Sequence, residues 1–306
     1  MSSVRKEIPV SHFYFWDKIP EELHLAVMIE FADNGCRYLT LPWQLLLLFH
    51  RKETGFRKNF LDKVHAAGLS ILEAHAPCGA GLSLNSPDPA LRDTMLNAHL
   101  DCMRIAADAG AGTYTVHIET RPYMDMEQPM GELVEMSTAF MIRSLEHLLP
   151  EAEKLGLILT IENCFSPMNT AEQLLRCLNA FNSPFLKCCF DAGHANYMRS
   201  GKTWEKLPAY HRVNTWRGKI DFDDHVLEKL APFVATTHFH DNDGYSDQHR
   251  CPGDGTVEWG KIIPVLKQCP CIRSFQNETN ALENRVSIAR MCRTMMHLDS
   301  LGNNQP

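Results

Sequence analysis

Metal-ligating residue types are concentrated in one short stretch of this chain. The segment from His238 to Asp243 reads HFHDND and follows an apolar run at residues 233–237, and the triplet Asp247-Gln248-His249 comes soon after it. Imidazoles and carboxylates at a strand end cost desolvation energy unless they are paired or bound to a metal. Such a density of them therefore indicates part of a metal site, whose other ligands must come from other strand ends.

Residues of the same kinds end other short, β-rich runs along the chain. Six of them lie at or near such an end: His75, His117, Glu162, Asp191, His238 and Glu278. A residue that only capped the following helix would more often be Ser, Thr, Asp or Asn one step beyond the strand. Any one of the six could be a structural residue held by a hydrogen bond or a salt bridge. As a set, they predict a metal-binding or catalytic centre.

The length and composition are typical of a soluble globular protein. Its 306 residues are 44% hydrophobic and 22% charged, which is enough for a full-sized core. The net charge of −7 weighs against a nucleic-acid partner. Its 11 cysteines show no paired CxxC spacing and are expected to be reduced thiols. The segment from Met1 to Pro9 lacks the apolar core of a signal peptide, and no apolar run is long enough to span a bilayer. We expect a cytoplasmic protein with a small-molecule substrate and no membrane partner, and the sequence leaves open whether it is a homo-oligomer.

Short β-rich runs alternate with amphipathic stretches along the whole chain. The expected strands are Val10 to Trp16, Arg37 to Leu41, Ser70 to His75, Thr113 to Ile118, Leu157 to Glu162, Phe185 to Asp191, Val234 to His240 and Ile272 to Glu278. The expected helices are Glu21 to Asn34, Phe56 to Ala67, Pro89 to Ala109, Gly131 to Leu155, Ala171 to Ala180, Asp223 to Leu230, Trp259 to Lys267 and Leu282 to Leu301. Eight such repeats predict an α/β fold, a single (β/α)8 TIM barrel over residues 1–306, rather than a doubly wound sheet. In such a barrel the functional groups lie at the carboxyl ends of the strands, which is where the six residues fall.

The segment at residues 195–222 interrupts this regular alternation. It is longer than a loop plus one helix usually needs, and it is rich in aromatic residues, Trp216 among them. We interpret it as a lid or substrate wall, with surface packing under a long loop as the alternative.

The motifs around these strand ends resemble the xylose isomerase-like TIM barrel superfamily, from about Ser70 to Glu278. That superfamily includes sugar isomerases, ketose 3-epimerases and the endonuclease IV group of phosphodiesterases. The resemblance implies a divalent metal held by Glu162 in IEN, Asp191 in FDAGH, His238 in HFHDND and Glu278 in NET. This quartet identifies the superfamily but does not choose among its reactions.

The remaining motif residues match the endonuclease IV branch of the superfamily. That branch holds three zinc ions, and the resemblance implies that the additional ligands here are His75, His117, His194, Asp247 and His249. The nine positions together are the full ligand set of the branch. In the ketose epimerases an arginine before a Pro-Gly pair contacts the sugar, whereas this chain has His249 there, with Arg250 beside it. A single metal could also account for the nine residues if His75, His117 and His194 bind sugar hydroxyls.

Two functions are compatible with this pattern. The first is a metal-dependent hydrolase that cleaves a phosphodiester in a small nucleotide-like or cofactor substrate, with zinc as the expected metal and up to three ions per chain. DNA is not favoured, because the loop from Ala76 to Leu82 offers no aromatic wedge and the basic residues are scattered. The alternative is a sugar or sugar-phosphate isomerase or epimerase that uses one Mn²⁺ or Mg²⁺ ion. In either case Glu162 and Glu278 are the expected catalytic residues, and we expect His240, Arg250 and Trp216 to contact the substrate.

Overall fold

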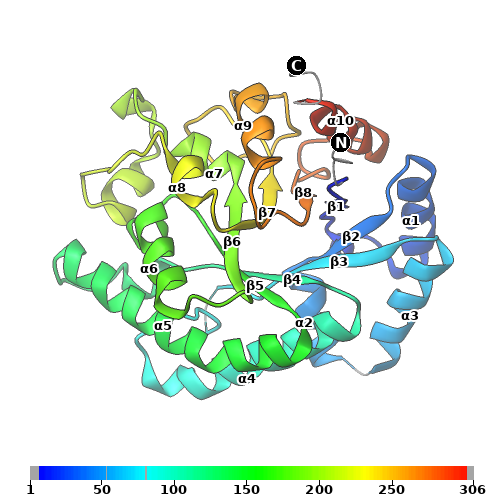
Figure 1. Ribbon diagram of the computed structural model, residues 1–306, viewed down its shortest axis with the longest axis horizontal. Coiled ribbons are helices and arrows are strands. Elements are labelled where there is room, and N and C mark those ends of the chain that lie inside the picture. Colours follow the sequence, from blue (N-terminus) through cyan, green and yellow to red (C-terminus); the bar gives the residue numbers. More distant parts are fainter. Residues whose placement is uncertain (1–6, 53, 80, 302–306) are drawn as a thin grey trace, which may run out of the picture.

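Eight parallel strands close into a barrel in the computed structural model, which describes residues 7–52, 54–79 and 81–301. The first residues of the amino-terminal segment and Ala80 of the loop after His75 lie outside these described ranges. The strands are paired in chain order, and β8 pairs with β1 to close the barrel (Figure 1). They are β1 (Val10–His12), β2 (Tyr38–Leu41), β3 (Ser70–His75), β4 (Thr113–Val116), β5 (Ile158–Glu162), β6 (Leu186–Asp191), β7 (Val234–Phe239) and β8 (Phe275–Asn277). The predicted (β/α)8 barrel is confirmed.

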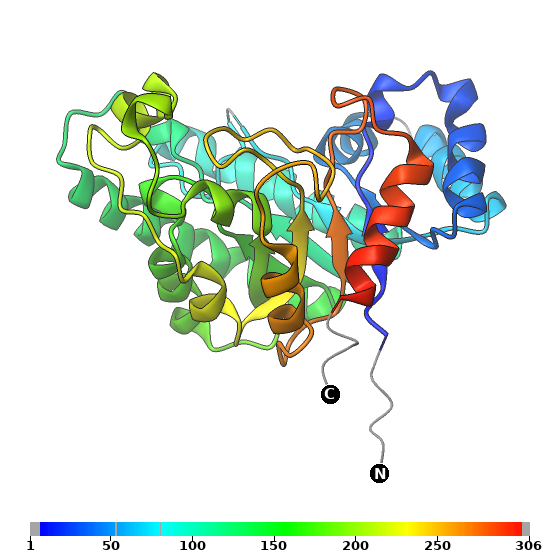
Figure 2. The same ribbon diagram turned by 90° about the horizontal axis from the view of Figure 1, so that it is seen from above.

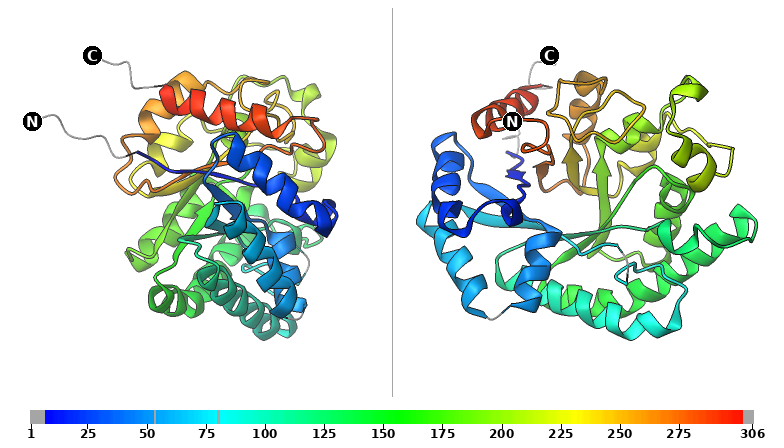
Figure 3. Two further views of the ribbon diagram at one scale, coloured as in Figure 1. Left: turned by 90° about the vertical axis from the view of Figure 1, so that its right-hand side faces the viewer. Right: turned by 180° about the vertical axis from the view of Figure 1, so that it is seen from behind.

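Helices surround the barrel and cover its outer face (Figures 1 and 3). They are α1 (His24–Asp33), α2 (Trp43–Arg51), α3 (Thr54–Ala66), α4 (Pro89–Asp108), α5 (Met130–Leu155), α6 (Ala171–Phe181), α7 (Ala192–Tyr197), α8 (Val226–Leu230), α9 (Trp259–Leu266) and α10 (Ile288–Ser300). Local signals set several of their ends. For example, Asp88 caps the start of α4 through the amide of Ala90, and Gly156 ends α5 in the left-handed conformation, with φ at 67°.

The interior of the barrel below the strand ends is polar. The Glu73 carboxylate is buried there and accepts hydrogen bonds from the hydroxyls of Ser11, Thr236 and Ser274. Because a buried carboxylate is tolerated only when its oxygens are hydrogen-bonded, these hydroxyls explain how an acidic side chain fits inside the barrel.

Several elements differ from the pattern that the sequence predicts. The run from Trp43 to Arg51 forms α2, and α7 begins directly after β6. The strands β1 and β8 are shorter than predicted, and α10 begins at Ile288 rather than at Leu282. No helix within the described ranges combines the length and the apolarity needed to cross a membrane.

The predicted lid segment, residues 195–222, runs from the end of α7 to the chain before α8. It contains a short 3-10 helix at Trp204–Lys206 and a π-helix at His211–Thr215. In Figure 2 the strands β7 and β8 point toward the side of the molecule on which this segment projects. Its Tyr210 and Thr215 reach the cavity at the carboxyl ends of the strands, so one part of the segment forms a wall of that cavity.

Candidate metal centre

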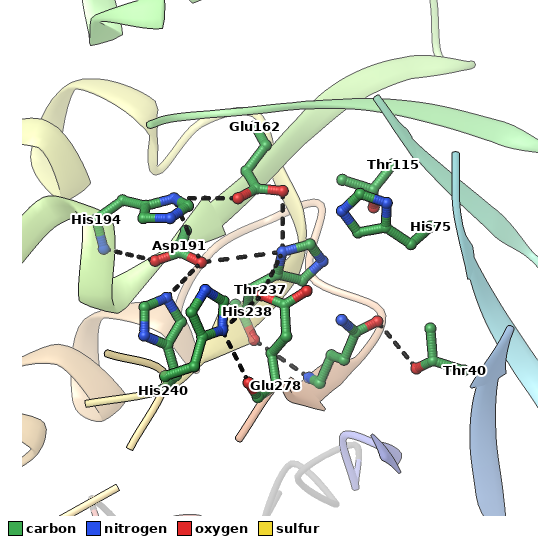
Figure 4. A network of polar contacts seen from close by, with 12 residues as sticks. Thr40, His75, Thr115, Glu162, Asp191, His194, Thr237, His238, His240 and Glu278 are labelled. Atoms are coloured by element: carbon green, nitrogen blue, oxygen red, sulfur yellow. Dashed lines mark hydrogen bonds and ion pairs between the residues drawn. The ribbon is translucent and has the colours of Figure 1, made fainter. Parts of the chain in front are cut away.

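The carboxyl ends of β5, β6, β7 and β8 bring four of the predicted ligands together (Figure 4). Asp191 and His238 are directly paired across β6 and β7. The Nδ1 atom of His238 lies 2.9 Å from Glu162 Oε2, 3.2 Å from Glu278 Oε2 and 3.9 Å from Asp191 Oδ2. All four side chains are buried. One imidazole nitrogen and three carboxylates therefore face a common point.

These four residues fit a divalent metal ion better than a hydrogen-bonded cluster. Neither ring nitrogen of His238 has a partner in hydrogen-bond geometry among the described residues, although Nδ1 is close to two carboxylates. When two ligand atoms each lie about 2.1 Å from one ion and the angle between them at the ion is about 90°, the atoms are about 3 Å apart. This separation matches the short contacts of His238 Nδ1 with Glu162 and Glu278. A bound cation would also offset the repulsion among the three buried carboxylates.

A second group of ligand types lies beside the quartet on β3 and after β4. His75 Nε2 is 3.1 Å from His117 Nε2, and His117 Nε2 is 3.0 Å from Glu162 Oε2. The other nitrogen of His75 is 2.9 Å from the carbonyl oxygen of Ala76. This contact makes Nδ1 the protonated nitrogen of a neutral ring and leaves Nε2 free to bind a metal. The ligand atoms of His75, His117 and Glu162 all lie within 4.8 Å of one another.

A third group surrounds Asp247, in the loop after β7. Its carboxylate lies 3.6 Å from His194 Nε2 and 3.3 Å from His249 Nε2. His240 completes a set of four whose ligand atoms lie within 4.8 Å of one another. All nine predicted ligands are thus located in one continuous cluster at the open end of the barrel.

The charges within the cluster shift its pKa values in opposite directions. Burial favours the neutral form of His238, but the carboxylates of Glu162 and Glu278 raise its pKa well above the usual value. Burial alone would raise the pKa of Glu278, yet the neighbouring His238 lowers it to about 2. Burial likewise opposes a charge on His249, but Asp247 raises its pKa to about 9. In the metal-free protein these histidines provide the positive charge that the carboxylates need.

Several residues that position the ligands were not predicted as site residues. Asn163 holds the backbone of Asp191 by two hydrogen bonds: its Nδ2 donates to the carbonyl oxygen at 3.0 Å, and its Oδ1 accepts from the amide at 2.9 Å. Gly193 is packed against the ring of His240, since a Cβ there would lie 2.1 Å from His240 Cε1. A glycine is needed at this position because α7 approaches β7 closely, and not because the backbone adopts a left-handed conformation.

Asp241, within the HFHDND segment, has a structural role. Its buried carboxylate accepts hydrogen bonds from the amides of Gly253 at 2.8 Å and Val257 at 3.1 Å, and from Trp259 Nε1 at 3.0 Å. Its backbone forms a bridge with Arg250. These bonds hold both ends of the loop that carries Asp247 and His249.

A cavity of about 440 Å³ opens above the cluster. Glu162, Glu278 and five of the other predicted ligands line it, and its walls are largely aromatic and apolar: Phe13, Phe15, Trp43, Ile118, Phe165 and Tyr210. A cavity of this size and lining, with a few convergent polar groups at its base, is typical of a site for a small molecule.

The three predicted substrate contacts do not line this cavity. His240 is fully buried beneath it, with Nε2 3.1 Å from Asp191 Oδ2 and its ring stacked on His249. Trp216 is buried in the lid segment and donates from Nε1 to the carbonyl oxygen of Phe165, so it supports the wall from behind. Arg250 makes its contacts on the loop side, toward the carbonyl oxygen of Asp254.

Comparisons with known proteins and solved structures identify relatives of this chain. An uncharacterized protein of Sinorhizobium fredii, y4fM, is 24% identical over 226 residues, which is 66% of this chain and 64% of that protein. This chain thus matches slightly less than two thirds of that relative. A solved structure described as a D-tagatose 3-epimerase-like protein is 18% identical, with a TM-score of 0.70 and coverage of 97% of this chain and 98% of its own.

Two further solved structures of this fold carry a metal ion in their descriptions. The IOLI protein with a bound zinc atom is 12% identical, with a TM-score of 0.66 and coverage of 96% and 98% of the two chains. A xylose isomerase-like TIM barrel protein from Mycobacterium smegmatis, in complex with magnesium, is 12% identical, with a TM-score of 0.64 and the same coverage.

A family model matches most of this chain and agrees with the observed barrel. The model describes the xylose isomerase-like TIM barrel and matches residues 30–275. That range contains β2 to β7 and all of the predicted ligands except Glu278. The chain belongs to the xylose isomerase-like TIM barrel family.

Proposed function

We propose that this protein is a metal-dependent epimerase or isomerase that acts on a sugar or a sugar phosphate. The observation that carries the proposal is the placement of Glu162 and Glu278 on two sides of the buried His238 Nδ1, at 2.9 and 3.2 Å, with both carboxylates lining the cavity. The likeness to a structure described as D-tagatose 3-epimerase-like supports it.

The two glutamates are suited to move a proton between the faces of a sugar. Their depressed pKa values reflect the neighbouring His238, which outweighs the effect of burial, and keep both carboxylates ionised at neutral pH. One ionised carboxylate removes the proton from a carbon next to the substrate carbonyl. The other glutamate, once it has taken up a proton from solvent, gives that proton to the same carbon from the opposite face, and the first then releases its proton to solvent. The configuration at that carbon is thereby inverted.

A divalent ion fits the same base of the cavity. Glu162, Asp191, His238 and Glu278 would hold it, and it would polarise the carbonyl oxygen of the substrate. The aromatic walls exclude water from the reacting carbon and give the apolar face of a sugar ring a surface to pack on. Chain residues thus provide both the binding surface and the proton transfer.

The direct test is a product assay with ketoses. Metal-free protein loaded with Mn²⁺, Mg²⁺ or Zn²⁺ is incubated with D-tagatose, D-fructose and their phosphate esters, and the products are separated by chromatography. We expect interconversion of epimers or of ketose and aldose that depends on the added metal. Conversion that persists after exhaustive chelation would contradict the proposal.

One observation favours a second candidate, the hydrolysis of a small phosphodiester. The groups around His117 and Asp247 provide ligand types for additional ions, and ions that share a bridging carboxylate stabilise phosphoryl transfer. Bis(p-nitrophenyl) phosphate is the probe. For this candidate, replacing Asp247 and His249 with Ala lowers bound zinc by about one ion per chain and hydrolysis by about 10²-fold. If hydrolysis and metal content are both unchanged in that variant, this candidate is wrong.

A further inference from the structure

A thiol lies among the metal-ligating groups at the base of the cavity. Cys164 follows Glu162 by two residues, just beyond the end of β5, and its partly exposed side chain lines the cavity. The ligand atoms of Glu162, Cys164 and His194 all lie within 4.8 Å of one another. Neither the metal quartet nor the mechanism described above uses this cysteine.

We propose that Cys164 is a thiolate ligand of a second transition-metal ion, held with Glu162 and His194. Sulfur and nitrogen bound to one tetrahedral zinc ion lie about 3.5 Å apart, so small side-chain rotations enclose an ion within this group. Glu162 would then bridge two ions, since its Oε2 faces His238 at 2.9 Å and its Oε1 faces His194 Nδ1 at 3.1 Å. The same Nδ1 lies 3.1 Å from the carbonyl oxygen of Asn163, and it would exchange that contact for the ion.

The surroundings of the group favour a reactive site over a closed structural one. Three protein ligands leave a fourth position open, and that position faces the cavity, because Glu162, Cys164 and His194 all line it. Phe165 packs edge-on against the His194 ring, at 5.0 Å between centroids, and shields one side of the group. His238 is fully buried and has no hydrogen-bond partner among the described residues, which points to metal in the adjoining quartet; an ion held by Cys164 would share the Glu162 carboxylate with that quartet.

A thiolate changes which metals the centre prefers. Soft sulfur ligands select zinc or cobalt, whereas oxygen ligands suit magnesium and manganese. The second ion is therefore Zn²⁺ or Co²⁺ even where the quartet accepts Mg²⁺ or Mn²⁺. Binding displaces the thiol proton to solvent, so no oxidant or reductant is needed.

Cobalt provides a readout that requires no substrate. The full-length, metal-free protein is loaded with Co²⁺, and the near-ultraviolet spectrum is searched for sulfur-to-cobalt charge transfer. We expect the absorption in the wild type, in Cys78→Ser, which changes another cysteine of the same cavity, and in Cys189→Ser, which changes the buried cysteine near His238. Only Cys164→Ser should abolish it. No band in the wild type, or a band that persists in Cys164→Ser, would overturn the proposal.

Two further measurements keep the test independent of how well the variant folds. Chelator competition should show that Cys164→Ser weakens Zn²⁺ binding about tenfold or more while Mn²⁺ binding is unchanged; an equal loss of both would mean that the cysteine only positions other ligands. In the wild type, added zinc should protect Cys164 from alkylation, as located by mass spectrometry, and unprotected alkylation would count against the proposal. Because none of these measurements involves turnover, their failure leaves the proposed epimerase or isomerase function untouched.

Discussion

His238 is the residue on which the candidate metal centre depends most. Its side chain is fully buried, and its Nδ1 lies within 4 Å of the three carboxylates of the quartet. A carboxylate cluster of this kind, at the base of a cavity, needs positive charge either from a protonated imidazole or from a metal ion. The raised pKa of His238 and the lowered pKa of Glu278 in the metal-free protein follow from this arrangement, and so does the placement of the four side chains around a common point.

Replacing His238 with Gln should therefore weaken metal binding. We expect metal affinity to fall about tenfold or more, because the amide keeps the size of the side chain but not the nitrogen ligand. Elemental analysis after dialysis measures the effect. Arg250→Gln is the matched control, since Arg250 lies outside the cavity lining, and equal metal content in the two variants would contradict the ligand role of His238.

At the scale of elements, the close packing of α7 on β7 positions the ligands of β6 and β7. Gly193 permits this packing, and the His240 ring that it touches holds Asp191 Oδ2 at 3.1 Å. A methyl group at position 193 would have to displace that ring. The position of a metal ligand thus depends on a glycine that binds nothing itself.

Gly193→Ala should consequently destabilise the protein by about 1–3 kcal/mol and lower its metal content. Chemical denaturation of the metal-free protein gives the first quantity and elemental analysis the second. Gly260→Ala in α9 is the control, because a Cβ there meets no atom within 4 Å and the change should be neutral or stabilising by up to about 1 kcal/mol. Wild-type stability and metal content in Gly193→Ala would show that the ring is free to move.

The sequence predicts the strand ends of this barrel better than the path of its loops. Glu162 and Asp191 end β5 and β6 as expected, because the buried runs before them have the length and composition of strands. The sequence does not predict the helix α2, because the run Trp43–Arg51 is too uniformly apolar to show a helical period. The sequence predicts that Trp216 contacts the substrate, but in the folded segment its indole nitrogen donates to the carbonyl oxygen of Phe165.

At the scale of the whole molecule, buried histidines away from the site couple stability to pH. His99 on α4 is buried, with Nε2 2.9 Å from the carbonyl oxygen of Leu82 and Nδ1 3.2 Å from the Tyr114 hydroxyl. Both contacts suit the neutral ring, which donates from Nε2 and accepts at Nδ1. Burial lowers the pKa of His99 to about 4.

The folded protein should lose stability as the pH falls from 6.5 to 4. In this window the unfolded chain binds a proton at His99 that the folded protein excludes, so acid favours unfolding. The contribution is fully present above pH 6.5 and amounts to about 3 kcal/mol. Denaturation of metal-free protein across this window should show a shallower pH dependence in His99→Gln, but not in His65→Gln on the exposed face of α3. Identical profiles for His99→Gln and the wild type would contradict this assignment.

In the proposed function the barrel holds two glutamates and a divalent metal ion around one carbon of the substrate, and solvent deuterium labelling tests this proposal most directly. Metal-loaded protein converts a ketose in D₂O, and NMR locates the label. The account predicts deuterium at the carbon next to the carbonyl in the wild type, and a rate lower by orders of magnitude in Glu278→Gln. Conversion without label, or equal labelling rates in the wild type and Glu278→Gln, would contradict proton transfer by this pair of carboxylates.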